Sequence, residues 1–177
     1  MKQIVFLFLQ AAVASTAFAQ YRPVDKGSSV AFTIKNFGIN TGGSFSGLLG
    51  EINFDNQDLS KASVKVSIDA NSINTDNQTR DEHLRQDTYF DVKAYPRIFF
   101  ASTKISRSGE AGVLLISGKL TIKNQTREIS FPFTATPDGN GYVFKGSFSI
   151  NRKDFGVGGT SIISNSLDVQ LSILATK

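Results

Sequence analysis

Eight segments of this chain alternate apolar and polar residues, whereas no long segment shows the 3.6-residue period of a helix. In the third segment, for example, Val64, Val66 and Ile68 alternate with Lys65 and Ser67. Successive side chains of a strand point to opposite faces, so each segment predicts a strand with one buried face. The predicted strands are residues 29–35, 44–54, 63–70, 98–105, 112–122, 127–135, 142–150 and 167–173.

The connections between these segments predict the arrangement of the sheet. Most are short, and Asp138-Gly139-Asn140-Gly141 is a strong signal for a two-residue hairpin turn between antiparallel strands. Gly47 and Gly50 lie within the second segment, where glycines usually mark bends, and bent strands help a sheet to close. The expected fold class is therefore all-β, an extended eight-stranded antiparallel barrel, with a two-sheet sandwich as the alternative.

Residues 77–91 form a long polar insertion between two predicted strands and are called the flap below. Charged residues surround Leu84 and Phe90 there without period-2 alternation, which predicts a short helix followed by a loop. Long loops of this kind often have a function. The flap is expected either to gate one mouth of the barrel or to be a fixed cap whose apolar residues belong to the core.

The N-terminal segment has the pattern of a secretory signal peptide. Lys2 is followed by an apolar run from Ile4 to Ala14, and Ala17-Phe18-Ala19 matches a cleavage site, so cleavage after Ala19 is expected. Residues 1–19 are therefore predicted to be a signal peptide and residues 20–177 a single barrel domain. The chain contains no cysteine, and export without disulfides fits a bacterial periplasm at least as well as a eukaryotic secretory route, so a periplasmic location is expected.

The apolar registers of the strands and flap predict what a barrel of this size could enclose. An eight-stranded barrel has room for its own side chains or for one slender ligand. The residues expected to face inward and to line a ligand cavity are Phe32, Ile34, Val66, Ile68, Leu84, Phe90, Ile98, Phe100, Ile116, Leu120, Phe131, Phe144, Phe148, Val169 and Leu171. Since all are aliphatic or phenyl side chains, any guest is expected to be a hydrocarbon. A core filled by these side chains alone is the alternative.

Several short motifs, in a fixed order, resemble those of a known family. They are Tyr21-Arg22-Pro23-Val24-Asp25, Ser29-Val30-Ala31-Phe32, Gly43-Ser44-Phe45, Asn74-Thr75, Gly118-Lys119-Leu120-Thr121-Ile122 and Asn151-Arg152-Lys153-Asp154-Phe155-Gly156. Together they resemble the YceI family over essentially the whole mature chain. The resemblance implies a lipocalin-like barrel, secreted and usually periplasmic, that holds an isoprenoid lipid or an isoprenoid quinone. Thr88-Tyr89 and Asn124 depart from the family pattern, and only the identity of the ligand is put in doubt by them.

Catalytic, metal and nucleic-acid sites are not expected. His83 with Asp81 could form a general base, but no nucleophile accompanies them, and scattered aspartates with one histidine lack metal-ligand spacing. The net charge of +4 is spread along the chain and makes no basic stripe for nucleic acid. Arginines at positions 80, 85, 97, 127 and 152 could bind a lipid phosphate, although solvated charge and rim salt bridges are the simpler interpretation. No cofactor beyond a bound lipid or quinone and no stable membrane insertion are expected, and a homodimer is possible.

Overall fold

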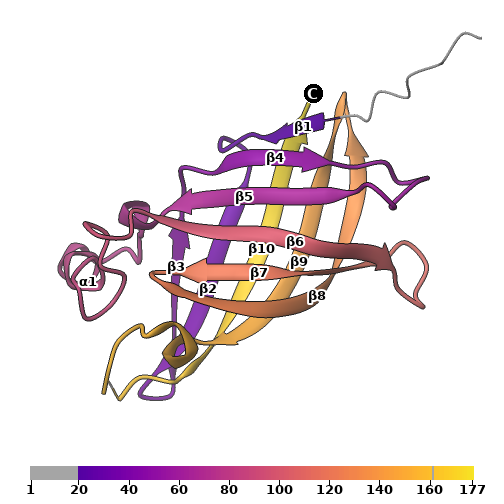
Figure 1. Ribbon diagram of the computed structural model, residues 1–177. Helices are drawn as coiled ribbons and strands as arrows, with labels where there is room; N and C mark the ends of the chain where they lie inside the picture. The colour runs from indigo at the N-terminus through magenta and orange to yellow at the C-terminus, as the bar shows by residue number, and fades with distance from the viewer. Residues whose placement is uncertain (1–19, 161) are drawn as a thin grey trace, which may run out of the picture.

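The computed structural model describes residues 20–160 and 162–177. The predicted signal peptide lies outside these residues. The strands are β1 (Gln20–Pro23), β2 (Ser29–Asn36), β3 (Ile39–Phe45), β4 (Leu49–Asn53), β5 (Ser63–Asp69), β6 (Arg97–Arg107), β7 (Leu114–Ile122), β8 (Gln125–Asp138), β9 (Gly141–Asn151) and β10 (Ser166–Thr176). One α-helix, α1 (Gln78–Leu84), and two short 3₁₀ helices, η1 (Ala70–Ser72) and η2 (Arg152–Phe155), lie between strands (Figure 1).

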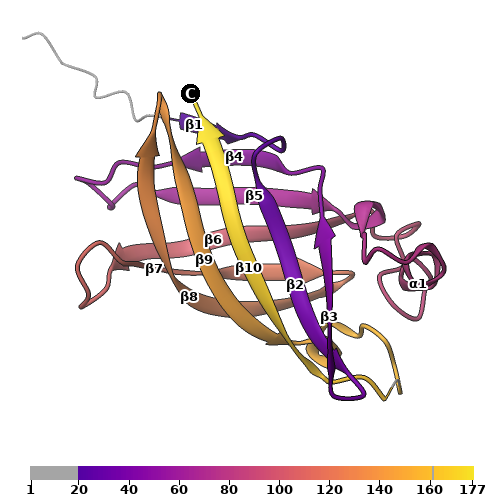
Figure 2. The same ribbon diagram turned by 180° about the vertical axis from the view of Figure 1, so that it is seen from behind.

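The strands form a closed antiparallel barrel. Each of β4 to β10 pairs with the next, and β1 completes the ring because Tyr21 pairs with Ile52 of β4 and Pro23 with Ala175 of β10. The β2–β3 hairpin extends the same wall, since β2 pairs with the part of β10 from Leu167 to Ser172 (Figure 2). The predicted eight-stranded antiparallel barrel with a short helical insertion is confirmed.

The strands differ most from the predicted ones in two places. The predicted second strand is two strands, β3 and β4, separated at Ser46–Leu48, and β3 begins at Ile39. At the break Gly47 has a φ of 70°, which strains any residue with a side chain. Strand β1 was not predicted, because four residues are too few to show a period of two.

The wall splays apart at the end near α1. Strand β8 pairs with β9 only from Phe133 onward. Among the described residues, the first half of β8 therefore pairs with β7 alone. Pro132 is the last residue before that β9 pairing begins, as suits a proline, which is confined to strand edges or bulges. On the other side, β3 meets the chain ahead of α1 through a single bridge, Ser44 to Asn74. The flap and the loop after η2 cover these gaps (Figures 1 and 2).

Apolar side chains fill the barrel as two clusters. One gathers around β1, where Phe54 packs edge-on against Tyr142 and Phe144 with ring centroids 5.1 and 5.2 Å apart. The other lies beneath the flap and includes Ile98 and Phe155. The space that remains between these clusters is the candidate site.

Candidate functional site

A cavity of about 280 Å³ lies inside the barrel, close to the lower limit of typical ligand pockets. Its wall is built by the period-2 registers of the strands. Val169 on β10, for example, lies between Phe32 on β2 and Phe148 on β9, so these three side chains share the inner face. The wall is almost wholly aliphatic and aromatic.

Every residue predicted to line the interior borders this cavity. These are Phe32, Ile34, Val66, Ile68, Leu84, Phe90, Ile98, Phe100, Ile116, Leu120, Phe131, Phe144, Phe148, Val169 and Leu171. Whether they contact a ligand stays a prediction.

The wall also includes residues that the sequence reasoning missed. Some, such as Val30, Val64 and Ile150, lie on the predicted apolar faces of their strands but were not among the residues expected to line the cavity. Others, such as Val157 and Ile163, come from the loop after η2, where no periodic signal exists. Tertiary folding alone brings these loop residues to the cavity.

Aromatic rings shape the middle of the cavity. Phe131 stacks on Phe148 with centroids 4.6 Å apart, and Phe100 lies 6.0 Å from Phe131. Gly118 makes room for the Phe100 ring, because a Cβ at that position would lie 2.5 Å from Phe100 Cζ. Removing the side chain on β7 thus lets a phenyl ring lie flat against the wall.

The two arginines that border the cavity are engaged by protein oxygens. Arg80 donates from Nε to Thr75 Oγ1 at 2.7 Å and from Nη2 to Thr75 O at 2.6 Å. Arg152 is buried and donates to the carbonyl oxygens of Val157 and Ser164 at 2.7 and 2.9 Å. Burial lowers the pKa of the Arg152 guanidinium, and the nearby Tyr89 opposes this shift. Both arginines serve to fix backbone around the cavity.

The other arginines considered for a phosphate are also bonded to the protein. Arg85 donates to the carbonyl oxygens of Asn71 and Ile73, both at 2.9 Å. Arg97 donates to the carbonyl oxygens of Gly47 and Ser67 at 2.7 and 2.8 Å. Arg127 is exposed and donates to Thr126 O at 2.9 Å. The simpler interpretation of these arginines, as structural or solvated charges, therefore accounts for their contacts.

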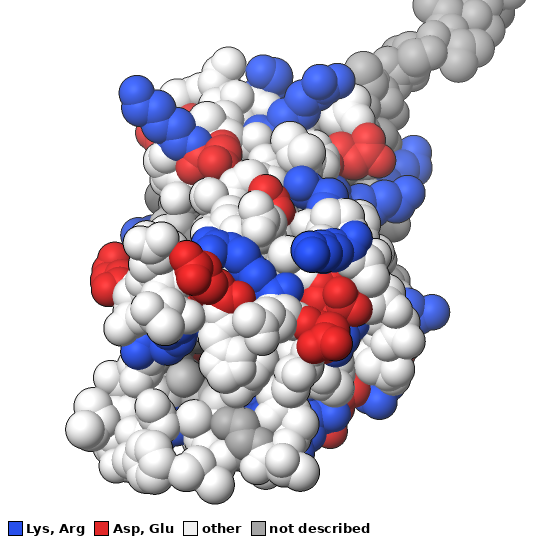
Figure 3. All heavy atoms as spheres, turned by 90° about the vertical axis from the view of Figure 1, so that its left-hand side faces the viewer, with Lys and Arg blue, Asp and Glu red and all other residues white. Residues whose placement is uncertain are grey.

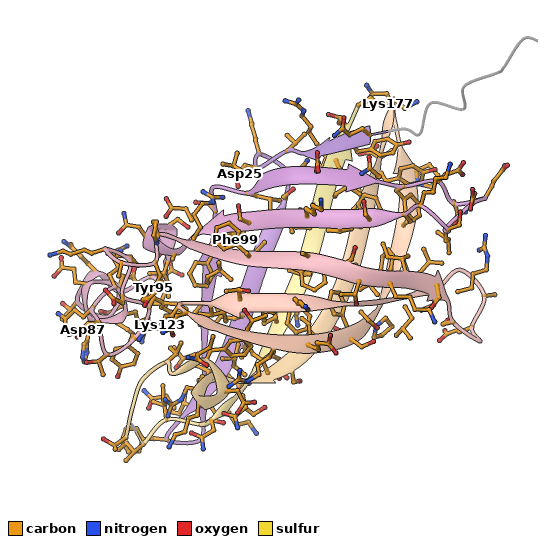
Figure 4. The ribbon with its side chains drawn as sticks, in the orientation of Figure 1. Asp25, Asp87, Tyr95, Phe99, Lys123 and Lys177 are labelled. Atoms are coloured by element: carbon orange, nitrogen blue, oxygen red, sulfur yellow. The ribbon has the colours of Figure 1, made fainter. Side chains whose placement is uncertain are left out.

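Hydrogen bonds hold the flap at its start and at its tip. At its start, the buried Asp81 carboxylate accepts from Thr75 N at 3.0 Å and from Thr75 Oγ1 at 2.5 Å. At its tip, Lys123 Nζ donates to Asp87 O at 2.8 Å and Gly158 N donates to Thr88 O at 2.9 Å (Figure 4). These bonds favour the fixed cap over the gate.

The apolar side of the flap closes the cavity. Leu84 and Phe90 both border it, and the Phe90 ring meets Phe45 of β3 edge-on at 5.4 Å. The flap thus adds an apolar contact to β3 beside its bridge to Asn74.

His83 lies outside the cavity wall. It is exposed, and its ring packs edge-on against Tyr89 at a centroid distance of 4.9 Å. Across residues 20–160 and 162–177 there is no group of three His, Cys, Asp or Glu residues that could hold a metal ion. His83 therefore has a structural contact and no neighbouring metal ligands of that kind.

The surface around the flap carries mixed charge. Figure 3 shows lysine and arginine interspersed with aspartate and glutamate on this side. No helix in the described part of the chain is long and apolar enough to cross a bilayer.

The comparisons with known proteins agree on one family. A UPF0312 protein of Pseudomonas paraeruginosa is 32% identical over 154 residues, which cover 81% of this chain and 80% of that protein. Burkholderia cenocepacia BcnA has a crystal structure with a TM-score of 0.81 at 26% identity, covering 87% of this chain and 99% of that one. A polyisoprenoid binding domain from Saccharophagus degradans, implicated in plant cell wall breakdown, shares the fold with a TM-score of 0.72 at 16% identity, covering 88% and 97% of the two chains. The family model of the YceI-like domain matches residues 21–175, and this chain accordingly belongs to the YceI family.

Proposed function

We propose that this protein binds an isoprenoid lipid, either a polyprenyl chain or the tail of an isoprenoid quinone, inside its barrel and carries or stores it. The observation that carries the proposal is the cavity of about 280 Å³ with its aliphatic and aromatic wall. A hydrocarbon chain needs no hydrogen bond, so such a wall suits it. The name of the structurally similar Saccharophagus degradans domain supports an isoprenoid ligand.

The energy of the cavity argues against the alternative of a self-filled core. The wall leaves about 280 Å³ of apolar space without side chains, and unfilled apolar volume lowers stability relative to a packed interior. At ~25 cal/mol per Å², burying a few hundred Å² of prenyl chain would contribute several kcal/mol to binding. A ligand thus recovers a free energy that the side chains themselves leave unused.

The proposed role is binding and not catalysis. His83, the one histidine, does not border the cavity, and the arginines that do border it are bonded to protein oxygens. No cofactor is proposed apart from the lipid. The signal-peptide pattern of residues 1–19 supports an exported, periplasmic carrier.

Mass spectrometry of an organic extract of the purified mature protein tests the proposal. A prenyl lipid should be recovered from the wild-type protein. Phe148→Arg should lose it, because a charge would be buried in the cavity wall, while Ser147→Arg should keep it, because Ser147 is the exposed neighbour on the same strand.

Two results would count against the carrier function. One is repeated absence of any lipid from the wild-type extract, with no uptake of added polyprenol, which would favour a structural barrel. The other is equal lipid content in the two variants with both folded by circular dichroism, which would place the lipid outside the cavity.

A further inference from the structure

Three large apolar side chains are exposed together at one end of the barrel. Phe37 and Ile39 are 76% and 71% exposed in the β2–β3 hairpin, and Ile162 is 76% exposed in the loop after η2. Ser164 N donates to Lys35 O at 2.9 Å, which holds this loop against the hairpin. Figures 1 and 2 show the hairpin and the loop at the lower end of the molecule. Phe37, Ile39 and Ile162 are together called the apolar tip below.

Phe37 contradicts the local rules of its turn. Asn36 pairs with Ile39, so Phe37 and Gly38 form a two-residue turn, and their φ angles of 50° and 81° are both positive. Such turns favour Asn, Asp or Gly at both positions, and a bulky residue with positive φ is strained. Because the Phe37 side chain is also exposed, neither the turn nor the core accounts for it. Exposed apolar residues that break a local rule are typical of interaction sites.

The apolar tip is continuous with the cavity. Asn36, next to Phe37, and Ile163, next to Ile162, both border the cavity, as does Thr41 on the same face of β3 as Ile39. The cavity therefore reaches the end of the barrel that carries the exposed side chains.

Charge points to the kind of partner. Residues 155–167 contain no charged side chain, and Lys35 is the only one between Gly27 and Gly50. The lower end in Figure 3 is accordingly almost free of blue and red. Around the tip, Lys35 and Lys153 are exposed, and so are the carboxylates of Asp154 and Asp168, the latter bonded to Ser149 Oγ. The tip itself can thus enter an apolar phase without desolvating a carboxylate.

We propose that the apolar tip docks the barrel onto a phospholipid bilayer. Phe37, Ile39 and Ile162 project from two turns rather than from a flat face or groove, so a fluid lipid surface accommodates them without complementary pockets. Docking of this kind is shallow and reversible, unlike a membrane span. Transfer of lipid between the docked end and the cavity rests on the proposed function. Docking to the bilayer does not depend on that function.

A single tryptophan can report the docking, because the chain contains none. We expect Phe37→Trp to show blue-shifted emission with vesicles of phosphatidylethanolamine and phosphatidylglycerol, and quenching when the phospholipids carry bromine. Leu115→Trp, on the outer face of β7 and 38% exposed, is the matched control and should respond to neither. Adding Ile39→Ser or Ile162→Ser to Phe37→Trp should weaken vesicle partitioning by about tenfold each, as expected for loss of one buried aliphatic side chain.

Three results would overturn the proposal: no response of Phe37→Trp, equal quenching at Leu115→Trp, or a blue shift that rises with protein concentration without vesicles. The last would identify a second copy of the chain as the partner. Because the vesicles contain no isoprenoid, the test is independent of the proposed function. If the protein yields lipid on extraction but does not bind vesicles, only the docking proposal is refuted. If it binds vesicles but never yields lipid, the docking proposal stands and the carrier function is refuted.

Discussion

Arg152 is the residue that connects the loop after η2 to the cavity. It is 3% exposed, and its guanidinium donates to the carbonyl oxygens of Val157, Ile163 and Ser164 and to Asn165 Oδ1. Five donors in a planar fork can reach several backbone oxygens at once, which an ammonium group cannot. A loop without regular secondary structure is thus given a fixed path.

Arg152→Lys should therefore destabilise the protein by about 2–4 kcal/mol, because buried carbonyl oxygens lose their donors. Arg127→Lys is the control, since Arg127 is exposed and should change stability by less than about 0.5 kcal/mol. Urea unfolding followed by circular dichroism measures both. Equal midpoints for the two variants would show that the loop does not depend on the guanidinium.

Tyr21 links the stability of the barrel to alkaline pH. Burial raises the pKa of its phenol, and nearby Tyr142 and Asp55 add to the effect. An unfolded tyrosine ionises near pH 10, so below that pH both states are protonated and the contribution is fully present. Above it the unfolded chain loses its proton first, and stability falls as the pH rises through the folded-state pKa.

Tyr21→Phe should accordingly flatten the loss of stability above about pH 10, where one such group contributes at most ~1.4 kcal/mol per pH unit. Denaturant midpoints of both proteins, measured from pH 8 to pH 11, provide the test. Between about pH 8 and about pH 9, where Tyr21 is protonated in both states, the difference in stability between the two proteins should stay constant. A parallel decline of the two curves above pH 10 would assign the alkaline sensitivity to other groups.

Among the elements, those with regular alternation were predictable from sequence and the others were not. The burial of β7 alternates strictly from Leu114 to Ile122, because both of its neighbours pair along its length. By contrast, β1 is too short to show a period, and the break between β3 and β4 depends on a turn whose geometry no alternation encodes. Regular alternation also decides which residues of the cavity could be predicted. Cavity residues on strands could be predicted, and Ile163 on its loop could not.

The two elements that cover the splayed end can be distinguished as routes for lipid. The flap is bonded at its start through Asp81 and at its tip through Asp87 and Thr88. The loop after η2 is joined to β2 by the bond from Ser164 N to Lys35 O. Because the chain has no cysteine, an engineered pair can form only the intended disulfide.

We expect a Ser44→Cys and Asn74→Cys pair, which joins β3 to the chain just ahead of the flap, to leave prenyl-chain exchange unchanged on oxidation. A Lys35→Cys and Ser164→Cys pair should slow exchange when oxidised and restore it when reduced, because it fixes the loop beside the apolar tip. Exchange of a fluorescent polyprenol measures both rates. The opposite pattern, slowing by the Ser44 and Asn74 pair alone, would make the flap the gate.

At the scale of the whole molecule, the barrel combines a closed wall with an incompletely filled interior. The closed ring of backbone pairing holds the wall together even where side chains leave the interior unfilled. The aromatic cluster around Tyr21 and Phe54 packs one end, and the flap covers the other. The fold class was predictable because every predicted strand has one apolar face, whereas the cavity depends on side-chain volumes that alternation does not encode.

An incompletely filled interior predicts that larger side chains in the cavity should raise the stability of the lipid-free protein and weaken lipid binding. Val66 and Val169 both border the cavity, whose unfilled volume can receive larger side chains. Val66→Phe combined with Val169→Phe should fill part of the cavity and raise the unfolding free energy of the lipid-free protein by about 1 kcal/mol. The same change should lower the lipid recovered by extraction, because the phenyl rings occupy the space of the prenyl chain.

Lys65→Phe combined with Gln170→Phe is the matched control, since these exposed neighbours place the same rings on the outer face of β5 and β10. The control should bind lipid as the wild-type protein does. If the cavity-filling variant retained its lipid, the ligand would have to lie elsewhere on the barrel. If it lost stability as well as lipid, the wall would already be packed, and the cavity would not be the underfilled interior that a lipid carrier requires.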